Sequence, residues 1–195
     1  MTPPLALLQT SANDPDWSNT RNSQYVQQIV QAQRHGNTCL PTRLGLTEQD
    51  YAALLHTYAA TLNPFMIEPS PTAVECSALR QQLLDLRRDE WQDLVDLLLS
   101  HRLQQDESEI WLAHIVAAAC MGSEHLWRDL GMQTREQLRQ LLTDNFPELV
   151  RRNDKDMRWK KFFYKQLCEQ EGGYVCRSPT CEQCPTYHDC FGDES

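Results

Sequence analysis

Residues 108–122 read SEIWLAHIVAAACMG and are apolar on nearly all sides. A helix that is hydrophobic all round belongs in the interior of a protein rather than on its surface. We therefore predict a buried central helix here, with Ser108 as its N-cap and His114 as a histidine of the core.

On either side of this segment the sequence shows further helix signals. Thr47 opens T-E-Q-D and Thr134 opens T-R-E-Q, and both resemble the capping box that begins many helices. Residues 75–104 place Trp91 and three aliphatic residues at helical spacing, which predicts one helix. We also expect a helix over 25–35, a short one ending at Gly131, and a long one over 148–171 closed by glycines 172 and 173.

No run alternates apolar and polar residues between turn signals, so the predicted fold class is all-α. Residues 1–24 lack periodicity and are rich in Pro, Ser, Thr, Asn and Asp, which predicts a flexible N-terminal arm. A helical domain is expected over 25–172, and an irregular, cysteine-rich, cluster-binding tail over 173–195.

Composition and the lack of certain motifs reduce the number of functional classes to consider. A chain of 195 residues with 41% hydrophobic residues suits one domain with an ordinary core. The net charge of −9 argues against a general nucleic-acid partner. The N-terminal run LALL is too short for a signal peptide or a membrane span, so we expect a cytoplasmic protein. No phosphate loop, G-x-S-x-G or H-E-x-x-H motif occurs, and we therefore do not expect an enzyme.

Residues 176–190 read CRSPTCEQCPTYHDC, which spaces four cysteines as C-x4-C-x2-C-x5-C. In a reducing cytosol, such clustering points to metal binding or redox chemistry rather than to structural disulfides. Thiolates are soft ligands that suit zinc and iron–sulfur clusters. Structural zinc usually takes two well-separated C-x2-C pairs, whereas C-x4-C-x2-C is a ferredoxin spacing. The spacing favours an iron–sulfur-type cluster, with zinc and redox thiols as alternatives.

Three stretches resemble the NifQ family of nitrogen-fixation proteins. They are HLWRDLG (125–131), RWKKFFYKQLCEQEG (158–172) and CFGDE (190–194). The resemblance implies a molybdenum–iron–sulfur cluster (Mo, Fe and sulfide) and a role as molybdenum donor for the iron–molybdenum cofactor of nitrogenase. It implies as partners the nitrogenase cofactor-assembly scaffold, the nitrogenase iron protein and molybdate, with no nucleic acid or membrane. The family's cysteine motif maps onto Cys176, Cys181, Cys184 and Cys190.

Molybdenum that must be passed on is better served by some harder or exchangeable ligands than by thiolates alone. His188 or Asp189 could supply such a ligand, although an exposed tail histidine is the alternative for His188. His125 and Cys168 are further candidate ligands, with structural and core roles as their alternatives. We take Cys39, Cys76 and Cys120 as core or spectator thiols.

Basic residues cluster between 151 and 165, and every lysine of the chain lies in this stretch. If one continuous helix spans it, Arg151, Lys155, Arg158, Lys161 and Lys165 fall within an arc of about 120°. Such a surface could attract molybdate or dock an acidic partner, with Arg158, Lys161 and Lys165 as its centre. The alternatives are a solvated helix face and, for the whole protein, a zinc-stabilised interaction module or an iron–sulfur redox protein.

Overall fold

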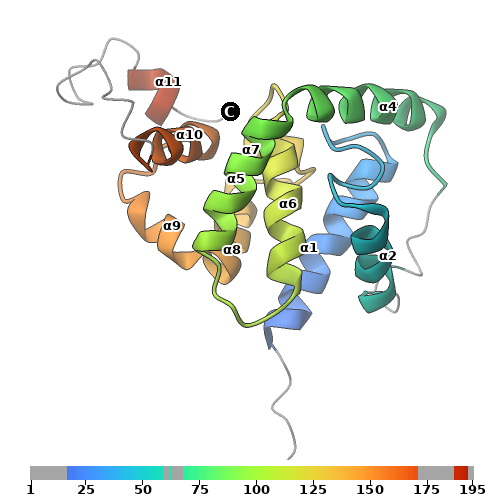
Figure 1. Cartoon of the computed structure of the whole chain (residues 1–195), viewed down its shortest axis with the longest axis horizontal. Helices are drawn as coiled ribbons and strands as arrows, with labels where there is room; N and C mark the ends of the chain where they lie inside the picture. Colours follow the sequence, from blue (N-terminus) through green and yellow to red (C-terminus); the bar gives the residue numbers. More distant parts are fainter. Residues whose placement is uncertain (1–16, 59–61, 63–67, 171–186, 193–195) are drawn as a thin grey trace, which may run out of the picture.

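The central helix α6, Ser108–Cys120, is buried along nearly its whole length in the computed structural model of the chain. Leu112, Ile115 and Val116 have no exposed surface. Helix α5, Arg88–Ser100, packs along α6 with Leu94 and Leu98, which are also fully buried. Figure 1 shows these two helices side by side in the middle of the molecule. The predicted buried central helix is therefore confirmed.

The structure describes residues 17–58, 62, 68–170 and 187–192, and these ranges contain helices and no strand, which agrees with the predicted all-α class. Around α5 and α6 lie α1 (Trp17–Arg34), α2 (Glu48–Thr57), α4 (Pro71–Leu86), α7 (Leu126–Asp129), α8 (Arg135–Asn145), α9 (Pro147–Arg152), α10 (Trp159–Gln170) and α11 (Tyr187–Phe191). None of the helices in these ranges is long and apolar enough to span a membrane.

The beginning of α6 differs from the prediction, because Ser108 is not its N-cap. The backbone N–H of Ser108 donates to Asp106 Oδ1 at 2.7 Å. The hydroxyl of Ser108 instead accepts a hydrogen bond of 2.7 Å from Asn22 of α1. The buried carboxylate of Glu109 accepts the backbone N–H groups of residues 104, 105 and 106. The turn before α6 is thus closed by acidic side chains, and Ser108 joins α6 to α1.

Three predicted helix boundaries are wrong. Helix α1 begins at Trp17 rather than at residue 25, so residues 17–24 belong to the helical part, and 1–16 lie outside the described residues. The helix predicted over 75–104 is two helices that meet at Arg87. The helix predicted from 148 breaks between α9 and α10. There Asn153 exchanges two hydrogen bonds of 2.8 Å with the backbone of Met157, and Asp156 has a positive φ of 54°.

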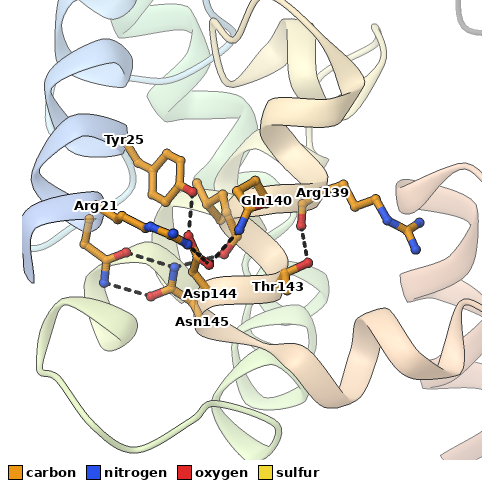
Figure 2. A network of polar contacts seen from close by, with 9 residues as sticks. Arg21, Tyr25, Arg139, Gln140, Thr143, Asp144 and Asn145 are labelled. Carbon is orange, nitrogen blue, oxygen red and sulfur yellow. Dashed lines mark hydrogen bonds and ion pairs between the residues drawn. The ribbon is translucent and has the colours of Figure 1, made fainter. Parts of the chain in front are cut away.

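The N-terminal half of α1 is held to α8 by a polar network (Figure 2). The carboxylate of Asp144 accepts hydrogen bonds from Arg21 at 3.0 Å and from the hydroxyl of Tyr25 at 2.7 Å. Asn22 and Asn145 are both buried and form a reciprocal pair of amide hydrogen bonds at 2.9 and 3.0 Å. Paired amides satisfy their polar atoms away from water, so this contact fixes α1 against the core.

The local signals at Thr47, Thr134 and Gly131 are confirmed. The hydroxyl of Thr47 accepts the N–H of Asp50, and that of Thr134 accepts the N–H of Gln137. Gly131 ends the short α7 segment with a φ of +74°, and a Cβ there would lie 2.2 Å from the Cβ of Ala32. Both the backbone conformation and the close approach of α1 therefore require glycine at 131.

Candidate functional site

Cys190 is the one cysteine of the motif that the described residues include, and it lies in α11 against the beginning of α10 (Figure 1). Its carbonyl oxygen accepts a hydrogen bond of 2.8 Å from the backbone N–H of Arg158. The Arg158 side chain donates from Nε to the carbonyl oxygen of Gly192 at 3.3 Å. Cys190 and Phe191 are partly buried and pack on the hydrophobic core. Residues 187–191 are thus helical and anchored, which corrects the expectation of a wholly irregular tail.

The other three cysteines, Cys176, Cys181 and Cys184, lie outside the described residues. The four-cysteine ligand set therefore stays a prediction. His188 lies on α11 and is exposed. The backbone of Asp189 belongs to the same helix, but its side chain lies outside what the structure describes. Cys168 is partly buried on α10.

A pocket of about 260 Å³ lies beside Arg158 on the α7 side. His125, which precedes α7, lines it together with Arg158, Lys160 and Lys161 from the beginning of α10. The fold therefore brings His125 next to the residue that contacts the backbone of Cys190. The carboxylate of Glu124 also lines the pocket, but cationic side chains outnumber it, which favours a small anion as the occupant.

The wall of this pocket is fixed by an ion pair between Lys160 and Asp129 that sequence reasoning missed. Lys160 Nζ contacts the Asp129 carboxylate and donates to the carbonyl oxygen of Gly122 at 2.7 Å. Asp129 also accepts the N–H of Glu124 at 3.1 Å, and its side chain is only 5% exposed. A Cβ on Gly122 would lie 2.4 Å from the Asp129 carboxylate carbon. The loop before α7 is thereby attached to α10 through a nearly buried charge pair.

A second basic pocket, of about 380 Å³, lies on the α9 side of α11. Phe191 lines it, as do Arg152, Lys155 and Lys165, with Asp154 and Glu169 among the remaining lining residues. Cationic side chains therefore lie on both sides of the segment that ends in Cys190.

The predicted continuous basic face is wrong, because the chain turns between α9 and α10. Arg151 lies on α9, where it pairs with Glu148, and Lys155 lies in the turn. Lys161 and Lys165 remain one turn apart on α10; Lys161 is exposed, and Lys165 forms an exposed ion pair of 3.6 Å with Glu169.

Two of the cysteines outside the motif, Cys39 and Cys120, behave as core thiols. The Cys39 thiol donates to the carbonyl oxygen of Ala119 at 3.5 Å, and burial raises its pKa far above the ordinary value. Burial also raises the pKa of the Cys120 thiol to about 12. Both thiols therefore stay protonated near neutral pH and are poor metal ligands. Within the described residues, no group of three or more His, Cys, Asp and Glu side chains is arranged to hold a metal ion.

Together, the fold and the motif define a class of protein: a small helical domain in which basic pockets lie on both sides of α11, the helix that carries the last cysteine of the motif. The NifQ family model matches residues 25–192, and the chain belongs to the NifQ family.

Curated relatives agree with this assignment. The chain is 58% identical to Protein NifQ of Azotobacter vinelandii over 174 residues, which covers 89% of each protein. It is 36% identical to Protein NifQ of Klebsiella pneumoniae over 80% of this chain and 90% of that protein. It is 33% identical to Protein NifQ of Rhodobacter capsulatus, over 80% and 79% of the two chains. The resemblance seen in the sequence is confirmed, and no solved structure matches the chain.

Proposed function

We propose that this chain is a molybdenum–iron–sulfur cluster protein that supplies molybdenum for biosynthesis of the iron–molybdenum cofactor of nitrogenase. It acts as a cytoplasmic carrier and not as an enzyme. The observation that carries the proposal is the C-x4-C-x2-C-x5-C motif in a chain of the NifQ family, with its last cysteine anchored on α10. Membership of this family is consistent with a role in nitrogen fixation.

The donor set fits such a cluster. Cys176, Cys181, Cys184 and Cys190 would hold it through thiolates, which are the ligands that iron–sulfur clusters take. When bound, the cluster supplies the iron and sulfide framework that holds molybdenum. Several anionic thiolates in a short segment repel one another, and the basic side chains beside α11 offset that charge.

Molybdate is the cargo in this proposal, and the pocket between His125 and Arg158 is where we expect it to arrive. Molybdate is a small, doubly charged oxyanion, and Arg158 and Lys161 present positive charge around that pocket, whereas Lys160 is paired with Asp129. His125, His188 and Asp189 are the candidate nitrogen and oxygen ligands for molybdenum. Their harder donor atoms would bind molybdenum less firmly than a full set of thiolates and so permit its transfer.

The first test is the metal content of anaerobically purified protein. We expect a brown protein that contains iron, sulfide and molybdenum. Stoichiometric zinc without iron would instead support the zinc-stabilised interaction module. Iron and sulfide without molybdenum, after growth with ample molybdate, would support the iron–sulfur redox protein.

The second test concerns delivery to the cofactor-assembly scaffold and the nitrogenase iron protein. Lys161 and Lys165 form the exposed part of the proposed docking surface, whereas Arg158 also contacts the C-terminal segment. We expect Lys161→Glu/Lys165→Glu to slow molybdenum transfer at low salt and to keep a preloaded cluster, because exposed charges act mainly on the rate of encounter. Arg43→Glu/Arg88→Glu, which makes the same change in net charge at two other exposed positions, is the matched control. Equal transfer rates for the two variants would show that α10 is only a solvated face.

A further inference from the structure

A third cavity, of about 580 Å³, has the size of a small-molecule pocket. Its walls come from the loop after α1, from α4, from the end of α6 and from α7. The lining includes the two thiols Cys39 and Cys76, the basic side chains of Arg80 and Arg128, and an apolar wall that contains Leu83 and Met121. The cavity adjoins the pocket beside Arg158, with which it shares Ser123 and Glu124.

Arg80 supplies positive charge to the wall of this cavity. Its Nη1 atom is buried and has no hydrogen-bond partner in the part of the chain that the structure describes. A guanidinium cannot lose its charge at any pH relevant to proteins, and a buried donor without a partner is costly. A positively charged group in this position therefore favours an anionic partner.

The acidic groups around the cavity are occupied elsewhere. Asp129 pairs with Lys160 and accepts the N–H of Glu124. The Glu124 carboxylate lies 3.9 Å from Arg128 in an exposed pair. Cys39 also fails to supply a negative charge, because its thiol is kept protonated by burial. Among the residues that the structure describes, none accepts a hydrogen bond from Arg80 Nη1.

Several of the other side chains that line the cavity are aliphatic, and they favour contact with a hydrocarbon group. Leu84 and Ala118 lie buried in the cavity wall, whereas Leu79 and Leu83 lie one turn apart on α4 and are 59% and 47% exposed at its rim. Large aliphatic side chains that remain exposed beside a cavity gain by contact with an apolar ligand. The ligand should therefore combine one anionic group with an aliphatic body.

We propose that this cavity binds a small aliphatic carboxylate. The carboxylate accepts hydrogen bonds from Arg80, whose planar guanidinium matches two carboxylate oxygens, and the aliphatic part contacts Leu83, Leu84 and Met121. The neutral thiol of Cys39 makes a metal ion a poor alternative occupant. This site would be independent of the cysteine motif, and its ligand class does not depend on the function proposed above.

The test is calorimetric titration of the full chain with unbranched carboxylates from butanoate to octanoate, with octanol as the uncharged control. We expect saturable binding of octanoate, affinity that rises by up to about fourfold for each added methylene, and much weaker binding of octanol. Arg80→Gln should weaken octanoate binding by roughly tenfold to a hundredfold, since a charge-assisted contact is lost. Arg88→Gln, at an exposed arginine on the neighbouring helix, should bind like the wild type.

Three results would overturn the proposal: no saturable binding of octanoate, equal binding of octanol, or undiminished binding by Arg80→Gln. The helical circular dichroism of each variant shows whether it is folded. If Arg80→Gln does not fold, Arg80→Lys decides the matter, because lysine keeps the charge but lacks the planar pair of donors. Octanoate binding by Arg80→Lys should be weaker than in the wild type, and unchanged binding would count against the proposal.

Discussion

The α5–α6 pair and the α10–α11 junction are built on opposite principles. Between α5 and α6 the contact is made by fully buried aliphatic residues such as Leu98 and Leu112. At the junction, two hydrogen bonds from Arg158 hold a short helix with an exposed histidine and a partly buried Cys190. The first arrangement gives stability, and the second places reactive groups where solvent and partners can reach them. Substitutions between α5 and α6 should therefore lower the stability of the protein, whereas substitutions at the junction should mainly affect the cysteine site.

The first prediction tests the core half of this comparison. Leu112→Ala removes a fully buried side chain from the centre of α6 and should lower the free energy of unfolding by about 3–5 kcal/mol. Denaturation with urea, followed by circular dichroism, measures the loss. Leu86→Ala, at a leucine that is 81% exposed on α4, should cost less than about 0.5 kcal/mol. Similar losses in the two variants would mean that α6 is not the centre of the core.

The second prediction concerns the ion pair between Lys160 and Asp129, which attaches α7 to α10. Asp129→Asn leaves the ammonium of Lys160 largely buried without its counter-charge and should cost about 3 kcal/mol of stability. Glu169→Gln breaks the exposed pair with Lys165 and should cost less than about 1 kcal/mol. The double variant Asp129→Asn/Lys160→Met should be more stable than Asp129→Asn alone, because the unpaired charge is gone. If it is not, the pair does not behave as a buried one.

The third prediction tests whether the cluster can be lost while the helical domain stays stable. Cys190→Ser should abolish the iron–sulfur absorption yet cost less than about 1 kcal/mol of stability, because the contact with Arg158 is made by the backbone carbonyl and not by the thiol. Cys181→Ala and Cys184→Ala should likewise remove the cluster without loss of helical circular dichroism. Cys168→Ser, at a partly buried position on α10, should keep the cluster. Global unfolding of Cys190→Ser would show that the metal stabilises the whole domain.

The smallest expected effect is a dependence of the free energy of unfolding on pH that is caused by His114. Burial lowers the pKa of His114 below its usual value near 6.5, and the ring packs on Trp91 with centroids 5.4 Å apart. The unfolded chain therefore binds a proton more readily than the folded protein, so stability should begin to fall as the pH drops below about 6.5. His114→Gln should flatten this part of the curve, measured as the urea midpoint between about pH 8 and about pH 5. An unchanged curve would assign the acid sensitivity to other groups.

Local sequence signals predicted the ends of several elements and the character of the core. Thr47 and Thr134 cap helices because a hydroxyl at that position meets a backbone N–H three residues later, whatever surrounds it. The apolar run of α6 could belong only to an interior helix. The same logic failed at Ser108, because Asp106 caps the turn and a distant residue, Asn22, binds the serine hydroxyl.

The features that shape the site could not be predicted in this way. The turn between α9 and α10 depends on Asn153 satisfying the backbone of Met157, and no Gly or Pro marks it in the sequence. The pairing of Lys160 with Asp129 joins residues far apart in the chain, and its partner could not be read from spacing. The return of Cys190 to Arg158 is likewise a tertiary contact. The motif identifies the candidate ligands, whereas the side chains that surround them are set by the tertiary structure.

The return of α11 to the beginning of α10 has a consequence for the thermodynamics of loading. Residues 171–186 leave from Gln170 at one end of α10, and the chain comes back at Tyr187 beside the other end. A chain that is held at both ends has less configurational entropy than one that is held at a single end. The helices and the Arg158 contacts bear this cost. Ligands supplied from between these two fixed ends should therefore bind metal more tightly than ligands on a chain that is held at Gln170 alone.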